Sequence, residues 1–462
     1  MLTFFDGRRT RREFLRVGGL TLGGLTLPRL WELQAQANSD GRAVTDKSVV
    51  FLFLQGGPSQ FETFDPKMAA PSNIRSATGE IATSLSGVTY GSTFGRLAKL
   101  AHKTTIVRSF RTGDANHNIK PVVCKDTLDA NLGSLYARIA GTNHPTSGMP
   151  LNVALFPRAV DSDTQPGTMN FGRFDSVGSL GSAYAPFIPG GDGAFQQDLR
   201  LNMPRDRLDD RRRLLGQLDG LKRGIDNPAD GQGLDRLRQQ AFDAILGGVG
   251  SAFDWAKEDP RTIERYDTKS LVNPESISKR WKNHNNYADH GASLGKLLLL
   301  ARRLCEAGCG FVTVTTNFVW DMHADENNAP CEEGMGYCGR PLDHAVSAFI
   351  EDIEARGLSK RILLVVCGEM GRTPRLNAKG GRDHWGTLAP LMLYGGGLNM
   401  GRVIGQSTRD GGEANSDAVA IPNLIATILQ TLLDVGKLRT MPGVPSDLAR
   451  VITTEPIPGL VG

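Results

Sequence analysis

The sequence has no C-x-x-C pair, no long apolar run and no large excess of charge. Without C-x-x-C spacing, its six cysteines do not form a zinc ribbon. No apolar stretch reaches the roughly 20 residues that a spanning helix needs, so we expect no membrane span in the mature protein. The formal net charge is +4 over 462 residues, which excludes the strongly basic footprint of a nucleic-acid-binding protein. With 40% hydrophobic and 22% charged residues, the composition is that of a globular protein.

The small basic excess lies at the N-terminus. Residues 1–37 contain six arginines, and the rest of the chain has 47 basic and 46 acidic residues. The motif "RREFL", which begins at Arg11, precedes a weakly apolar, glycine-rich stretch and a later "AQA" triplet. This order resembles a twin-arginine (Tat) export signal with its cleavage site, and an amphipathic N-terminal helix is the alternative. We therefore expect residues 1–37 to engage the Tat export machinery, and the mature protein to be periplasmic or otherwise exported.

Export would place the cysteines in an oxidising compartment, where disulfides are permitted. Cys331 and Cys338 flank a glycine-containing stretch that we interpret as a loop. This pair is the best candidate for a bridge, although sequence does not fix the pairing.

Short apolar runs alternate with helical patterns along residues 38–462. "SVVFLFLQGG" (48–57), 311–316, 361–367 and 389–397 are typical of buried strands, whereas 288–308, 342–356 and 421–433 are typical of helices. This alternation predicts an α/β domain with a mainly parallel sheet. Residues 195–285 instead contain charged helical patterns, which we interpret as a helical insertion within that domain.

Candidate site residues follow the predicted strands, where ligands bind in parallel sheets. Asp321 and His323 follow one strand, and Glu369 and Arg372 follow another. His384 lies in "GGRDHWG" next to Asp383. Carboxylates and imidazoles are ligands of zinc or manganese, and an arginine can neutralise an anionic ester. The alternative is that these are local hydrogen-bonded loop pairs.

A further candidate is "ANHN", which contains Asn116, His117 and Asn118 after a strand-like "TTIV". It is either part of the site or an asparagine-rich turn. "GASLG" (291–295) matches a serine-hydrolase pattern, but we predict that Ser293 lies inside a helix. Asp343 and His344 are expected to cap or face the start of a helix.

The motifs "GEMGRTP", "GRDHWG", "FLQGGPSQFETFDPK" and "ANHN" together resemble domain-of-unknown-function family 1501, a family of Tat-exported bacterial proteins. The resemblance implies an α/β three-layer sandwich with a mainly parallel central sheet, similar to alkaline phosphatases and sulfatases, with a helical insertion. It also implies metal ligands at Asp321 and His323, with His384 as a distal ligand.

Three positions depart from the pattern of the alkaline phosphatase and sulfatase superfamily. Gln55, Gly56 and Gly57 stand where an aspartate is expected, Glu369 stands at an Asp-His position, and Asn116 and His117 stand where a nucleophile is expected. A sulfatase C/S-x-P-x-R motif is absent from the sequence.

The leading hypothesis is a metal-dependent hydrolase of a phosphate or sulfate ester, either a small anionic molecule or a glycan ester. Its divalent cation would be zinc, manganese or calcium. The proposed ligands are Asp321, His323, Glu369 and His384. Arg372 would neutralise the ester, Asn116 and Asn118 would contact it, and His117 would act as acid or base or as a further ligand. The alternative is a member of the superfamily that has lost the reaction and binds a ligand, a glycan or a cell-envelope partner.

Overall fold

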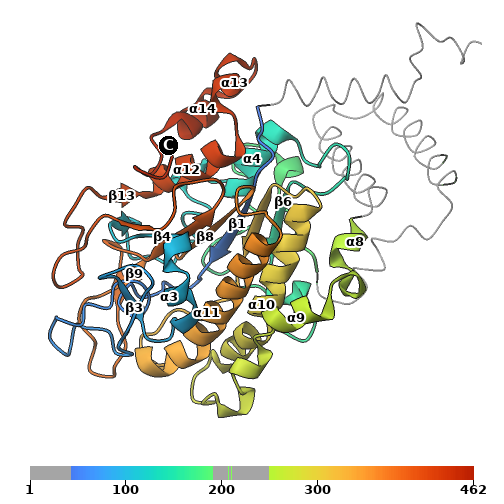
Figure 1. Ribbon diagram of the computed structural model, residues 1–462. Helices are drawn as coiled ribbons and strands as arrows, with labels where there is room; N and C mark the ends of the chain where they lie inside the picture. Colours follow the sequence, from blue (N-terminus) through green and yellow to red (C-terminus); the bar gives the residue numbers. More distant parts are fainter. Residues whose placement is uncertain (1–42, 191–206, 208–209, 211–248, 462) are drawn as a thin grey trace, which may run out of the picture. The chain divides into compact units, whose positions relative to one another are not determined.

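A seven-stranded sheet is the centre of the domain (Figure 1). The computed structural model describes residues 43–190 and 249–461 and the isolated positions 207 and 210, and the expected signal at 1–37 lies outside them. The strand order is β12 (Arg402–Ile404), β4 (Thr104–Val107), β11 (Leu391–Gly395), β8 (Ile362–Cys367), β1 (Ser48–Phe53), β7 (Phe311–Val314) and β6 (Asn152–Leu155). Strand β11 runs antiparallel to both neighbours, and all other pairs are parallel. The prediction of a mainly parallel sheet is confirmed.

Two hydrophobic cores cover the two faces of this sheet, because successive side chains of a strand point to opposite faces. Val50 and Leu52 of β1 belong to one core, whereas Val49, Phe51 and Phe53 belong to the other. All five are at most 1% exposed, which explains why β1 is apolar throughout instead of alternating.

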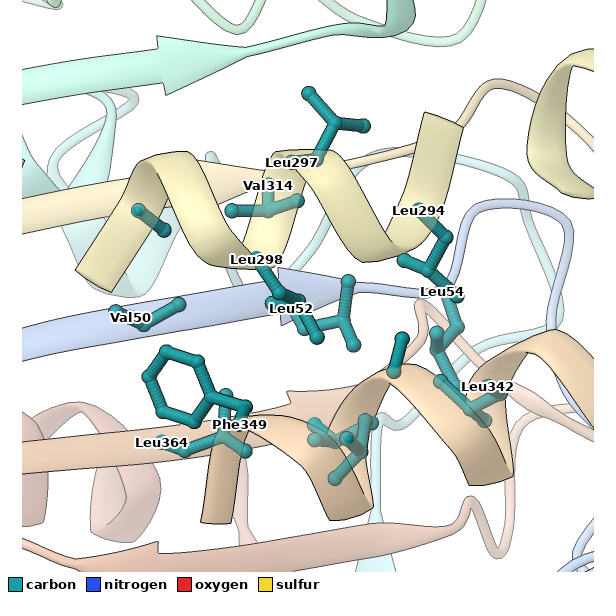
Figure 2. Close-up of a cluster of buried hydrophobic side chains, with 14 of the residues drawn as sticks. Val50, Leu52, Leu54, Leu294, Leu297, Leu298, Val314, Leu342, Phe349 and Leu364 are labelled. Carbon is teal, nitrogen blue, oxygen red and sulfur yellow. The ribbon is translucent and has the colours of Figure 1, made fainter. Parts of the chain in front are cut away.

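Helices form the outer layers and complete the predicted three-layer sandwich. Helices α10 (His284–Glu306) and α11 (Cys331–Ala355) pack against each other and cover the first face. Figure 2 shows Leu298 of α10 and Phe349 of α11 beside Val50 and Leu52. Helices α4 (Leu132–Ala140) and α12 (Ile421–Leu432) contribute to the second core.

The remaining elements are short. The helices are α3 (Gly95–Lys99), α8 (Gly250–Phe253), α9 (Pro260–Tyr266), α13 (Val435–Thr440) and α14 (Ser446–Thr453). The strands are β2 (Glu80–Ala82), β3 (Thr89–Gly91), β5 (Phe110–Arg111), β9 (Gly371–Arg372), β10 (His384–Trp385) and β13 (Val419–Ala420). In the predicted insertion at 195–285, residues 249–285 form short helices and turns with no strand, and most of the rest lies outside the described residues. Within the part of the chain that the structure describes, no helix combines the length and apolar character needed to cross a membrane.

The predictions of a helix start near residue 342 and of a bridge between Cys331 and Cys338 are wrong. Helix α11 begins at Cys331, not near residue 342, so Cys331 and Cys338 lie on one helix and are free thiols. Seven helical residues rise about 10 Å, beyond the roughly 7 Å limit between the Cα atoms of a disulfide. Asp343 lies inside α11 and not at its start, but its carboxylate accepts hydrogen bonds from the backbone N–H groups of Arg96 and Leu97, so it faces the start of helix α3.

The sequence-based rejection of a serine nucleophile agrees with the structure. Ser293 lies inside α10, and its hydroxyl donates to the carbonyl of Asp289 2.5 Å away. The "GASLG" stretch is therefore part of a packed helix and not a strand-to-helix turn.

Candidate metal centre

Three parallel strands deliver polar residues to one edge of the sheet. The segments that follow β1, β7 and β8 contain Gly56, Asp321 and Glu369, respectively. The backbone N–H of Gly56 donates to Glu369 Oε1 at 2.8 Å. Gly56 has a φ of +117°, and a Cβ there would lie 2.7 Å from the backbone nitrogen of Asp321. Glycine therefore lets the end of β1 approach the Asp321 segment closely.

Asp321 is the centre of the site, and it is only 7% exposed. Its Oδ2 accepts a hydrogen bond from Asn328 Nδ2 at 3.2 Å. Four side-chain nitrogens surround its Oδ1: Arg372 Nη2 at 2.5 Å, His323 Nε2 at 2.9 Å, His384 Nε2 at 3.4 Å and His117 Nε2 at 3.5 Å. A single carboxylate oxygen does not have enough lone pairs to bond all four.

The three histidines come from separate segments. His323 lies two residues after Asp321, His117 lies in the loop after β5, and His384 begins β10. The rings of His117 and His384 have centroids 4.3 Å apart, and those of His323 and His384 are 4.5 Å apart. Residues distant in sequence thus form one compact group.

The donor set suits a divalent cation. One ligand atom from each of His117, Asp321, His323 and His384 lies within 4.8 Å of the others. Three imidazoles and one carboxylate form a nitrogen and oxygen set that suits zinc. The Nε2 atom of His384 is buried and has no hydrogen-bond partner among the described residues. These residues therefore fit a metal ion.

Glu369 lies behind His117 and outside this four-donor group. It is fully buried, and its Oε1 lies 2.8 Å from His117 Nδ1. Its Oε2 has no hydrogen-bond partner among the residues described. A carboxylate on one ring nitrogen fixes the orientation of the histidine and directs the other nitrogen to the centre.

Arg372 is 1% exposed and is fixed by its neighbours. Its Nε donates to the carbonyl of Gly57 at 2.7 Å, and its Nη2 contacts the carbonyl of Gly56 and the Asp321 carboxylate. Its Nη1 lies 3.2 Å from His323 Nε2 and donates to a backbone carbonyl at 3.1 Å. Strand β9 pairs Arg372 directly with His384 of β10. Because protein groups use these donors, Arg372 supplies positive charge to the site more than new hydrogen bonds.

Two pKa shifts reflect this crowding. Burial alone would raise the pKa of Asp321, but Arg372 and the surrounding histidines outweigh it and hold that pKa well below its ordinary value. Burial would lower the pKa of His117, but the carboxylates of Asp321 and Glu369 outweigh it and raise that pKa. The charges of the site therefore stabilise an ionised Asp321 and a positively charged partner.

The other predicted residues lie further out. Asn116 and Asn118 are exposed, and Asn116 uses its backbone N–H to bond Asp114 Oδ1. Asp383 is also exposed, with its Oδ1 3.3 Å from His323 Nδ1. The structure thus brings together Asp321, His323, His384, His117, Glu369 and Arg372, and leaves the two asparagines outside the four-donor group.

Asn328 was not among the predicted site residues, although it bonds Asp321 directly. Its amide also accepts from Asn283 Nδ2 at 2.9 Å, and Asn283 Oδ1 accepts from Asn286 Nδ2 at 3.3 Å. The paired asparagines in "DENNAP", six and seven residues after Asp321, were the available signal.

Comparison with known proteins identifies the family. A model described as "Protein of unknown function (DUF1501)" matches residues 46–444, and the chain therefore belongs to this family, as the sequence motifs indicated. None of the curated proteins matches.

Several solved structures show weak similarity to the chain. The sulfatase PsFucS1 from Pseudoalteromonas sp. has 12% identity and a TM-score of 0.36, covering 87% of this chain and 70% of that one. A phosphonate monoester hydrolase from Silicibacter pomeroyi has 10% identity and a TM-score of 0.31, covering 83% and 73%. The alkaline phosphatase from the Antarctic bacterium TAB5 has 13% identity and a TM-score of 0.28, covering 79% and 95%. Similarities at this level do not assign a function, so the function is inferred from the side chains of this chain alone.

Proposed function

We propose that this chain is an exported, metal-dependent hydrolase of a phosphate or sulfate ester. The observation that carries the proposal is the convergence of His117, Asp321, His323 and His384, whose ligand atoms lie within 4.8 Å of one another. The buried Nε2 nitrogen of His384 supports it, because this nitrogen lies 3.4 Å from the Asp321 carboxylate without a hydrogen bond among the described residues, and an imidazole nitrogen at such a position is suited to a cation. The motif "RREFL" supports export.

The ligands we propose are Asp321, His323 and His384, with His117 at the same centre. A divalent cation held there supplies Lewis-acid polarisation of the ester. Arg372 adds a fixed positive charge 2.5 Å from Asp321, which favours binding of an anionic group. Since Arg372 is fixed by backbone carbonyls, its charge is preorganised and does not have to move during the reaction.

His117 has two possible roles, as acid or base and as fourth ligand. Its Nδ1 is bonded to Glu369, and its Nε2 faces Asp321 at 3.5 Å. Glu369 keeps the ring in one orientation in both cases. If His117 transfers the proton, His117→Ala retains metal and loses turnover, whereas a ligand role predicts loss of both.

Metal analysis and turnover of the signal-free protein test the proposal. We expect tightly bound stoichiometric metal and hydrolysis of 4-nitrophenyl phosphate or 4-nitrophenyl sulfate. Asp321→Ala and His384→Ala should lose metal and at least 100-fold of the activity, since a site lacking one ligand no longer holds the cation well. His102→Ala is the matched control, because His102 is exposed and pairs with Ser84 elsewhere. A metal-free, inert protein whose stability is unchanged in both site variants would overturn the proposal.

A binding protein without catalysis is the second candidate. It is favoured by the end of β1, where Gly56 and Gly57 supply backbone groups and no side-chain ligand. The resemblance to two-metal enzymes predicts an aspartate at that point, and the residues that the structure describes contain one group of metal-ligating side chains. A protein that holds metal and ligand but turns over neither ester would support this second candidate.

A further inference from the structure

A pocket of about 430 Å³ lies directly beside the metal-ligand cluster, with His117 and Asp321 in its wall. Its volume falls in the range of roughly 300–1,000 Å³ that is typical of small-molecule sites. The remaining lining residues are Thr168, Asn170, Phe171, Asn283, Asn286, Phe318, Asn327 and Asn328. A group bound at the cluster would therefore extend into this pocket.

The lining is polar but carries little charge. Five of the ten lining residues are asparagines, and none of the described lining residues is lysine or arginine. An asparagine amide offers two donors and a carbonyl acceptor, so it can bond a hydroxyl group in either direction. A pocket for a phosphate or a second anion would instead concentrate arginine and lysine. The side chains thus match a neutral partner rich in hydroxyl groups.

Part of this hydrogen-bonding capacity is committed, and part is available. Asn283 and Asn328 bond to each other and, through Asn328, to Asp321, which keeps their amides fixed. Among the described residues, the Asn170 amide and Asn286 Oδ1 have no protein hydrogen-bond partner. These two amides can therefore bond a ligand.

One wall of the pocket is aromatic. The rings of Phe171 and Phe318 are stacked with centroids 4.6 Å apart, and both lie beside His117 at 5.0 and 4.7 Å. The electron-rich face of an aromatic ring attracts the slightly positive C–H groups of a sugar ring. Amides on one side and aromatic rings on the other suit a pyranose or a similar polyol, which has hydroxyl edges and C–H faces.

We propose that this pocket binds the uncharged, hydroxyl-rich part of the substrate, a sugar or related polyol whose ester group reaches the cluster. The inference rests on the proposed hydrolase function for the identity of the ester. Binding in the pocket does not itself require turnover, so the two proposals can be tested separately.

Ligand-detected saturation-transfer NMR on the signal-free protein tests the pocket directly. The probes are methyl α-D-glucopyranoside, methyl α-D-mannopyranoside and methyl β-D-galactopyranoside, with cyclohexanol as an apolar ring of similar size. We expect binding of at least one glycoside in the millimolar range and no comparable signal from cyclohexanol. Equal signals from cyclohexanol, or no glycoside signal, would overturn the proposal.

Matched variants locate the binding. Asn286→Leu and Asn170→Leu should each weaken glycoside binding at least 5-fold, because each removes an amide and keeps the volume. Asn285→Leu is the control, since Asn285 is the exposed neighbour of Asn286 and does not line the pocket. Binding that is unchanged in both pocket variants refutes the assignment.

Activity measurements separate the two proposals. Ester hydrolysis without glycoside binding would support the hydrolase proposal and refute the proposal of a sugar pocket. Glycoside binding by a protein that hydrolyses neither 4-nitrophenyl ester would support the proposal of a sugar pocket and refute the hydrolase proposal.

Discussion

His290 should make the protein less stable in mild acid, and a single substitution should remove this effect. The ring belongs to α10 and is fully buried between the segment after β7 and helix α11. Its Nδ1 lies 2.6 Å from the hydroxyl of Thr316, after β7, and its Nε2 lies 3.1 Å from the carbonyl of Cys338. Burial lowers the pKa of His290 from 6.5 to about 4, although the Cys338 carbonyl opposes the shift. The folded protein therefore keeps this ring neutral.

The size of the effect follows from proton linkage. Between pH 6.5 and 4 the unfolded chain binds a proton on His290 that the folded chain does not bind, so the free energy of unfolding falls as the pH falls. Lowering the pH from 7 to 4.5 should cost roughly 2–3 kcal/mol from this residue alone, since each unit of pKa difference corresponds to about 1.4 kcal/mol. The loss is complete below the folded pKa.

Urea unfolding of the wild type and His290→Gln at pH 7.0 and 4.5 measures this contribution. Glutamine keeps a polar side chain but does not titrate, so the variant should lose roughly 2–3 kcal/mol less than the wild type between the two pH values. Comparing the two differences cancels the stability that the substitution itself costs at pH 7. Equal losses in the two proteins would refute a buried neutral His290.

Three further predictions concern strain, a buried ion pair and the thiols. Gly56→Ala should lower the free energy of unfolding in urea by at least 1 kcal/mol more than Gly87→Ala does. Both glycines have a positive φ, but a Cβ on Gly56 would lie 2.7 Å from backbone atoms, whereas a Cβ on Gly87 would meet nothing within 4 Å. Equal effects of the two substitutions would contradict this reasoning. Arg382 and Glu62 are fully buried and paired at 3.1 Å, so Arg382→Met should cost about 3–5 kcal/mol. Adding Glu62→Gln should restore part of that loss, and a double variant less stable than the single one would refute the pairing argument. Five of the six cysteines are buried, and all six are free thiols. A thiol reagent should therefore react with at most one cysteine in the native protein and with all six in urea. Rapid labelling of several cysteines in the native protein would contradict the core packing.

The sequence predicted five of the seven strands of the central sheet, because a strand buried on both faces is apolar throughout, but it missed β6 and β12. It did not predict that β11 runs antiparallel, since β11 is buried throughout like its parallel neighbours and its pattern does not reveal its direction. Ligands bind at the carboxyl ends of parallel strands, and this rule identified the segments that contain Asp321 and Glu369 as candidates for the site. That rule says nothing about long-range partners, so the bond between Glu369 and His117 was not foreseen.

The start of α11 shows how tertiary packing overrides local signals. Three glycines and Pro341 between residues 331 and 342 favour a loop, and Pro341 lies inside the helix. Cys331, Met335, Cys338 and Leu342 are nevertheless all at most 1% exposed. Their spacing of three to four residues is a helical stripe, and the burial of this stripe outweighs the weak helix propensity. The pocket was beyond local prediction, because its residues come from separate segments and the asparagine pair in "DENNAP" does not show which other residues it meets.

The contact between Arg372 and Asp321 has a consequence for how the protein is assembled. A buried carboxylate without a counter-charge would oppose folding, and many small metal domains fold only when their ion is present. Here a fixed guanidinium lies 2.5 Å from the carboxylate, so the negative charge is compensated by the chain itself. At the proposed metal site, folding and metal binding would then be separate events, and we expect the metal-free protein to remain folded.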